Sequence, residues 1–216
     1  MTRVLVAAAF VISTSAVASV QTPPQAPPPP AEVTVAIETA LGTITIAVDL
    51  AHAPITAGNF LKYVDAGIYD GGRFYRVTRP DNYPGTPPNR PQMNIIQGGI
   101  DPSTSAQRLP PIPLERTSVT GLKHVAGTVS MARGTPDSAT TEFFILLDDQ
   151  PSLDFGGKRF DDEQGAAAFG RVLSGLDVVK KIQQQGPLQE RNVQYLVTAV
   201  EITRMTRVKS RFGSLR

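Results

Sequence analysis

Residues 33–48 read VTVAIETALGTITIAV, and this stretch decides the fold class. From Val33 to Ile37 apolar residues alternate with polar or small ones, and after Gly42 the alternation resumes. A period of two is typical of strands that bury one face, and a glycine-containing turn between two such runs indicates a β-hairpin. The folded part of the chain therefore begins as β structure.

Two later segments have helical signals instead. Residues 53–67 carry Pro54 where a first turn tolerates it and Gly67 where a helix is terminated. Residues 174–185 have an apolar face, with Ser174 in position to act as the N-cap. The sequence therefore predicts two helices in a chain that is otherwise rich in strand patterns.

Short apolar runs predict the remaining strands, with long proline-rich loops between several of them. Two helices with about eight strands favour a mainly β fold, a closed eight-stranded antiparallel β-barrel capped by two α-helices. The further strands are expected at residues 73–77, 93–97, 125–132, 142–147, 167–172 and 195–202.

The N-terminus has the pattern of a targeting segment. A basic start at Arg3 is followed by an apolar run and by Ala16-Val17-Ala18, the small-x-small pattern of a signal-peptidase site. The run is shorter than the ~20 residues of a membrane span. We expect a cleaved signal peptide at residues 1–18, export to the periplasm or medium, and no stable membrane insertion afterwards. An uncleaved anchor is the alternative.

The other boundaries follow from composition. Residues 19–32 are rich in proline, which favours an extended spacer, with a docking motif for a proline-binding module as the alternative. We expect the folded domain at residues 33–204 and a basic, solvated tail without assigned function at residues 205–216.

Composition excludes several kinds of chemistry. The chain has no cysteine, which rules out disulfides, thiolate catalysis and Cys-based metal sites. His52 and His124 lie far apart without metal-ligand spacing, and Ser130 and Ser138 lack a G-x-S-x-G elbow. A net charge of +2 in 216 residues gives no nucleic-acid signature. We expect no metal, no cofactor, no nucleic-acid partner and a monomeric single domain.

Three stretches follow one another along the chain: Phe74-Tyr75-Arg76-Val77, Ile95-Ile96-Gln97-Gly98-Gly99, and Gly127 to Arg133 leading to Glu142-Phe143-Phe144-Ile145. Together with smaller supporting pieces, they resemble the cyclophilins, the cyclosporin-type peptidyl-prolyl cis–trans isomerases, and most of all their bacterial exported branch. The resemblance covers residues 33–203 and implies an eight-stranded antiparallel barrel capped by two helices. It also implies an enzyme, a peptidyl-prolyl cis–trans isomerase (EC 5.2.1.8), acting on Xaa-Pro segments of unfolded or partly folded proteins.

Rotation about an Xaa-Pro bond is slow because amide resonance sets a barrier of ~20 kcal/mol. A donor aimed at the amide nitrogen stabilises the twisted state, in which that nitrogen regains a lone pair. By resemblance Arg76 is the catalytic arginine, and Gln97 the glutamine that supports it and binds substrate. On position alone, Arg76 would be an ordinary solvent-facing strand residue.

The resemblance also implies the substrate-binding residues. Ile95, Phe144 and Leu153 would line the slot for the proline ring, although plain barrel core is the alternative for apolar residues in such strands. Ala132 and Arg133 would lie along the rim where the substrate backbone runs. The full substrate-binding set is Tyr75, Phe74, Ile95, Ala132, Arg133, Glu142, Phe144 and Leu153.

Several residues depart from the family pattern. Tyr75 stands where histidine is frequent, Asn94 where a phenylalanine walls the slot, and Glu142 where glutamine is common. Ser152 replaces a tryptophan found in some members, and Phe160, in an enlarged loop at residues 155–165, is a candidate for a missing aromatic. These departures leave a second hypothesis open, a proline-peptide-binding module with weak catalysis. A carbohydrate-binding domain has little support because the chain has no Trp.

Overall fold

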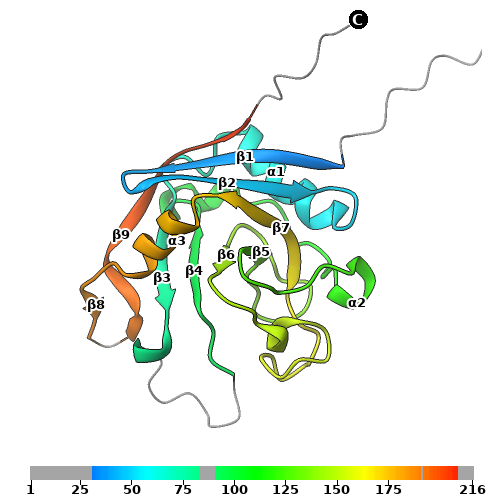
Figure 1. The fold of residues 1–216 in the computed structure, drawn as a ribbon. Helices are drawn as coiled ribbons and strands as arrows, with labels where there is room; N and C mark the ends of the chain where they lie inside the picture. The colour runs from blue at the N-terminus through cyan, green and yellow to red at the C-terminus, as the bar shows by residue number, and fades with distance from the viewer. Residues whose placement is uncertain (1–30, 83–90, 191, 209–216) are drawn as a thin grey trace, which may run out of the picture.

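The computed structural model describes residues 31–82, 91–190 and 192–208. Eight strands form one antiparallel sheet that closes on itself, because β1 pairs with both β2 and β9 (Figure 1). Around the barrel the order is β1-β2-β7-β5-β6-β4-β3-β9, which confirms the predicted closed eight-stranded antiparallel β-barrel. The strands are β1 (Glu32–Thr39), β2 (Gly42–Asp49), β3 (Arg73–Thr78), β4 (Ile95–Gly99), β5 (Thr128–Met131), β6 (Phe143–Leu146), β7 (Ala167–Ser174), β9 (Asn192–Arg207) and a short β8 (Leu188–Gln189) paired with β9.

The predicted hairpin is confirmed as β1 and β2. Val35 faces Ile46 and Ile37 faces Ile44 across the β1–β2 ladder, and all four side chains are fully buried. Gly42 closes the turn with φ +130°, a conformation that glycine adopts without the strain a Cβ would bring. The alternation of apolar residues in β1 and β2 therefore places one apolar face of the hairpin in the interior of the barrel.

Two longer helices pack against the barrel, as predicted. Helix α1 (Pro54–Asp65) buries Phe60, whose ring contacts those of Tyr69, Phe143 and Phe169 at centroid distances of 5.0–5.5 Å. Helix α3 (Leu176–Gln183) buries Val178, Val179 and Ile182. Shorter elements are α2 (Thr117–Thr120) and the 3₁₀ turns η1 (Pro80–Asn82), η2 (Pro102–Gln107) and η3 (Pro151–Leu153). Among the described residues no helix is long and apolar enough to cross a membrane.

The start of α3 differs from the sequence prediction. Ser174 ends β7 rather than capping the helix, and Gly175 is the N-cap residue, with no side-chain cap. Gly175 has φ +89°, and a Cβ there would lie 2.4 Å from the carbonyl oxygen of Thr43. Only glycine fits this abrupt change from strand to helix.

The C-terminal strand extends the domain beyond the expected boundary at residue 204. Strand β9 continues to Arg207, and Met205 is fully buried in the barrel core. Arg207 also forms an ion pair with Asp65 of α1 at 2.6 Å. Residues 205–207 are therefore part of the barrel, because their backbone closes the ladder with β1. The predicted signal peptide, most of the linker and the remainder of the tail lie outside the described residues.

A β-bulge in β3 prepares the functional site. The ladders from β3 to β4 and from β3 to β9 both change register between Phe74 and Arg76. Phe74 and Val77 are fully buried, whereas Tyr75 and Arg76 between them are only partly covered. A bulge places consecutive side chains on one face of a strand. Tyr75 and Arg76 consequently project together from the outer surface of the barrel.

The apolar residues separate into two clusters. The larger one fills the barrel and includes Phe74 and Phe143. The smaller one lies outside the barrel, between the outer face of β4 and β6 and the segment around Leu153. It consists of Met93, Ile95, Phe144, Leu146, Leu153 and Ala166, with Ala132 and Phe160 packed against it.

Candidate active site

One row of outward side chains crosses three neighbouring strands. Arg76 of β3 lies opposite Gln97 of β4, and Gln97 lies opposite Phe144 of β6. Residues in directly paired positions share one face of a sheet. The row thus brings a cation, an amide and an aromatic ring together, although Arg76 and Phe144 are 68 positions apart in the sequence.

The guanidinium group of Arg76 is held by two amide side chains. Nη1 donates to Gln97 Oε1 at 2.8 Å, while Nε and Nη2 donate to Gln194 Oε1 of β9 at 3.1 and 2.7 Å. Within the described chain, none of the hydrogen bonds of Arg76 goes to a carboxylate. The group is therefore positioned without having its charge neutralised.

A cavity of about 100 Å³ opens beside this guanidinium. Its apolar part is built from the outer cluster, and its polar part comes from Arg76, Gln97 and two further arginines. Phe144 and Leu153 are 3% and 0% exposed, so they form a fixed floor. The lining residues are Arg76, Met93, Ile95, Gln97, Ala132, Arg133, Phe144, Leu153, Arg159 and Phe160.

The opposite wall of the cavity is held by Arg133. Its Nη1 and Nη2 each donate to Asp162 at 2.8 Å, and its Nε donates to the carbonyl oxygen of Gly165 at 2.7 Å. The guanidinium also lies 3.8 Å from the centroid of the Phe160 ring. Arg133 therefore fastens the loop at residues 155–165 to the end of β5, with Phe160 facing the cavity.

Comparison with known proteins identifies the family of this chain. The sequence model of the family "Cyclophilin type peptidyl-prolyl cis-trans isomerase/CLD" matches residues 34–207. The chain belongs to the cyclophilin family. The expected enzyme class, peptidyl-prolyl cis–trans isomerase (EC 5.2.1.8), is confirmed by this membership.

Curated relatives include the peptidyl-prolyl cis-trans isomerase A of Dickeya dadantii, 37% identical over 69% of this chain and 70% of that protein. The isomerase of Acinetobacter baylyi is 38% identical over 68% of this chain and 70% of that protein. A cyclophilin-type isomerase structure from Cryptosporidium parvum matches with a TM-score of 0.62 and 19% identity, over 83% of this chain and 99% of that one. At that identity the structural likeness supports the cyclophilin fold alone.

Two residues predicted to bind substrate, Tyr75 and Glu142, are hydrogen-bonded behind Gln97 and not in the lining of the cavity. Gln97 Nε2 donates to the Tyr75 hydroxyl at 3.0 Å, and Tyr75 in turn donates to Glu142 Oε2 at 2.5 Å. Burial and the neighbouring Glu142 carboxylate raise the pKa of Tyr75. Burial also raises the pKa of Glu142, against the opposing effects of the Tyr75 hydrogen bond and the charge of Arg108. Neither residue lines the cavity.

Two further expectations need correction. Phe74 does not face the cavity, because the bulge turns it into the barrel, where it packs edge-on against Phe143 at 5.7 Å. Asn94 does not wall the slot either, since its Nδ2 donates to Asp148 at 2.9 Å and Met93 lines the cavity in its place. The period-two series 93, 95 and 97 is the sequence signal that would have selected Met93.

His124 packs against Phe144, which forms part of the floor of the cavity. Its ring stacks on Phe144 at 6.4 Å, while Nδ1 contacts Asp154 at 2.8 Å and Nε2 contacts Ser130 at 3.0 Å. Burial opposes ionisation of Asp154, but hydrogen bonds from His124 lower its pKa overall. Ser130 is 0% exposed, so this Ser-His-Asp arrangement has no access to a substrate. Within the described residues no group of three His, Asp or Glu side chains could hold a metal ion.

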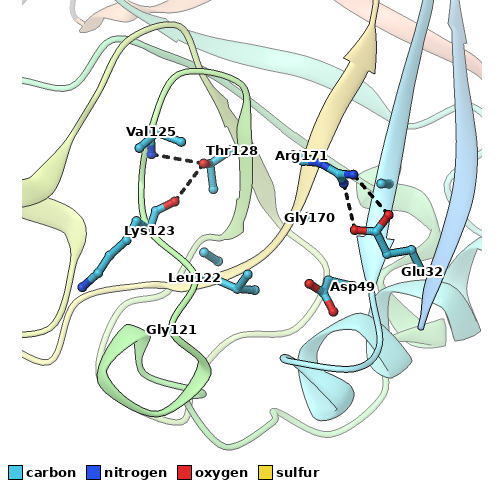
Figure 2. Close-up of a pocket in the computed structure, with 11 residues that line it drawn as sticks. Glu32, Asp49, Gly121, Leu122, Lys123, Val125, Thr128, Gly170 and Arg171 are labelled. Atoms are coloured by element: carbon cyan, nitrogen blue, oxygen red, sulfur yellow. Dashed lines mark hydrogen bonds and ion pairs between the residues drawn. The ribbon is translucent and has the colours of Figure 1, made fainter.

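A second cavity of about 360 Å³ lies between β2, β7 and the loop around Gly121 (Figure 2). Its ionisable side chains are already paired: Glu32 with Arg171, Asp49 with His52, and Lys123 with Asp154. The figure shows the Glu32–Arg171 pair at its rim and Thr128 bonded to the backbone of the loop. The smaller Arg76 cavity is therefore the better candidate for the active site, because its cation is not neutralised.

Proposed function

We propose that this cyclophilin accelerates rotation about Xaa-Pro bonds through Arg76, without covalent chemistry. In the planar amide the nitrogen lone pair is delocalised, and in the twisted state it becomes localised and basic. A guanidinium N–H directed at that nitrogen stabilises the twisted state more than either planar isomer. That difference is the condition for catalysis.

The observation that carries this proposal is the pairing of an unneutralised guanidinium with a small apolar cavity. A cavity of about 100 Å³ is of a size to take the compact proline ring. Phe144 and Leu153 would hold the ring, and Gln97 would keep the guanidinium beside the rotating bond. Permanent charge and a planar set of donors suit arginine to this task.

The test is the cis-to-trans exchange of an Ala-Xaa-Pro-Phe peptide, which takes tens to hundreds of seconds when uncatalysed. We expect acceleration by the wild-type protein and loss of most of it in Arg76→Ala. Arg76→Lys keeps the charge but removes the planar fork, so an intermediate rate is expected. No acceleration at micromolar wild-type protein would overturn the proposal.

A second candidate function is binding of proline-containing segments with slow catalysis. It is favoured by the departures from the family pattern at Asn94 and Glu142 and by the enlarged loop at residues 155–165. This function predicts saturable peptide binding that Arg76→Lys leaves unchanged, without exchange broadening in NMR spectra of the peptide. Fast exchange of a bound peptide would eliminate it.

We further propose that the clients are exported proteins and that this chain is itself exported and works as a monomer. The basic start, apolar run and small-x-small site of residues 1–18 support export. Cell fractionation and N-terminal sequencing of the purified protein would test it. A cytosolic protein that retains residue 1 would refute export, and light scattering of the purified chain would test the monomer.

A further inference from the structure

Gln194 makes more hydrogen bonds to Arg76 than Gln97 does, although it lies outside the three stretches that resemble the family. Its Oε1 accepts from both Nε and Nη2, at 3.1 and 2.7 Å, whereas Gln97 accepts only from Nη1. We propose that Gln194 is a positioning residue for Arg76, acting on the reaction through the guanidinium. This proposal rests on the proposed function of Arg76.

The donor count explains what this position achieves. A guanidinium has five N–H donors, and three of them are engaged by the two glutamines. At most one N–H on Nη1 and one on Nη2 remain for substrate. Gln194 occupies the side of the fork that includes Nε, so the remaining donors are confined to the two terminal nitrogens. The orientation of the fork is thereby fixed before a substrate arrives.

The fold holds Gln194 in place through its neighbour Tyr195. Tyr195 lies opposite Arg76 in the β3–β9 ladder, and its ring stacks on that of Tyr75 at 5.8 Å. Next in sequence, Leu196 is 3% exposed and pairs with Leu188 of β8. Gln194 therefore precedes two anchored residues, which limits the freedom of its backbone.

The neutrality of Gln194 is as important as its reach. A glutamate at this position would accept from the same two donors as a charge-assisted bidentate pair. Such a pair would keep Arg76 in place but cancel much of the charge that the twisted amide requires. Position and charge can therefore be separated by two substitutions at one residue.

The experiment compares Gln194→Met, Gln194→Glu and the control Gln189→Ala in the peptide exchange assay. Methionine keeps the length of the side chain but removes the acceptor, so kcat should fall about tenfold with little change in KM. Gln194→Glu should also lower kcat, while its Arg76 Nε–H resonance remains sharp in ¹H–¹⁵N spectra. In Gln194→Met the chemical shift of that resonance should move toward the value of a solvent-exposed arginine. Gln189 donates to the carbonyl oxygen of Leu196 in the same hairpin without contacting Arg76, so Gln189→Ala should keep wild-type kcat.

The outcomes separate this proposal from the proposed function. A kcat for Gln194→Met within twofold of wild type, alongside an inactive Arg76→Ala, would overturn the role of Gln194 and leave that of Arg76 intact. An equal loss in Gln189→Ala would also overturn it, because hairpin integrity would then explain the effect. Full activity in Arg76→Ala would instead refute the proposed function. Melting temperatures establish that each variant is folded.

Discussion

The two walls of the cavity each present an arginine, and the two arginines are held in opposite ways. Arg76 is bonded to the neutral amides of Gln97 and Gln194. Arg133 is bonded to both oxygens of Asp162, and its side chain is 1% exposed. An ion pair with bidentate geometry satisfies both charge and donors. Arg133 is therefore suited to holding a loop, and Arg76 to stabilising a charge that develops during a reaction.

Partner charge, more than residue type or distance from the cavity, separates the two roles. Both guanidinium groups line the same cavity. If the comparison is right, substitutions on the β3–β4–β9 wall should change the rate with little effect on stability. Substitutions on the Arg133 wall should change stability and substrate affinity first.

The largest expected effect is that of Arg76→Ala. Removing a preorganised donor to the reacting group costs about 10²–10³ in rate in comparable sites. We expect kcat/KM in the peptide exchange assay to fall by about that factor, with a melting temperature close to wild type. A large drop in melting temperature would contradict the comparison, because it would make Arg76 a structural residue like Arg133.

The next effect is that of Arg133→Ala, which should act in the opposite direction. Losing the paired hydrogen bonds to Asp162 and the contact with Phe160 should destabilise the fold by about 1–3 kcal/mol. KM should rise because Phe160 is no longer held at the cavity, while kcat changes little. Urea unfolding and the exchange assay measure the two effects. A selective loss of kcat would instead place Arg133 among the catalytic residues.

A smaller effect is expected from Asp162→Asn, which keeps the shape and removes the charge. The hydrogen bond from Arg133 lowers the pKa of Asp162, although partial burial opposes this. A lowered folded-state pKa means that the carboxylate contributes stability above its unfolded value, about 3.9, and that this contribution is lost as the pH falls.

The melting temperature of Asp162→Asn should therefore lie below that of wild type at neutral pH, and the gap should shrink as the pH falls below about 4. Asp162 is one third exposed, so salt should also reduce the gap. A gap that is independent of pH would show that shape rather than charge holds this wall.

Local sequence patterns predicted the frame of this site well. The hairpin and the two longer helices follow from the spacing of a few apolar residues, whereas Ile95 and Gln97 of β4 were identified by family resemblance. The β3 bulge does not, because strict alternation places Phe74 on the same face as Arg76. Only the register shifts against two neighbouring strands reveal that Phe74 turns inward.

Long-range partners were also beyond the reach of pattern reading. Gln194 meets Arg76 across 118 residues, and nothing in the short run around it indicates a partner. Arg133 and Asp162 are joined across 29 residues by the path of a loop that has no periodic signal. The family resemblance located Arg76 and Gln97, and the structure was needed to find what orients them.

The smallest effect tests Glu142, a carboxylate connected to the Arg76 wall by hydrogen bonds. Glu142 lies at the end of the chain Arg76–Gln97–Tyr75–Glu142, in which every donor points toward the carboxylate. The chain fixes the amide of Gln97 with its oxygen toward Arg76. Arg108 Nη2 lies 3.7 Å from Glu142 Oε1. Burial raises the pKa of Tyr69, and the negative charge of Glu142 raises it further.

Because the pKa of Glu142 is raised in the fold, its proton stabilises the folded state at low pH. That contribution is lost as the pH rises from the unfolded value of 4.5 through the folded one. Gln has no proton to lose, so the melting temperature of Glu142→Gln relative to wild type should increase from about pH 4 to about pH 7. A flat difference would mean that Tyr75 and Arg108 fully compensate the buried charge. The Arg76 wall would then contain an ion-paired carboxylate, as the Arg133 wall does, and the contrast between the two walls would weaken.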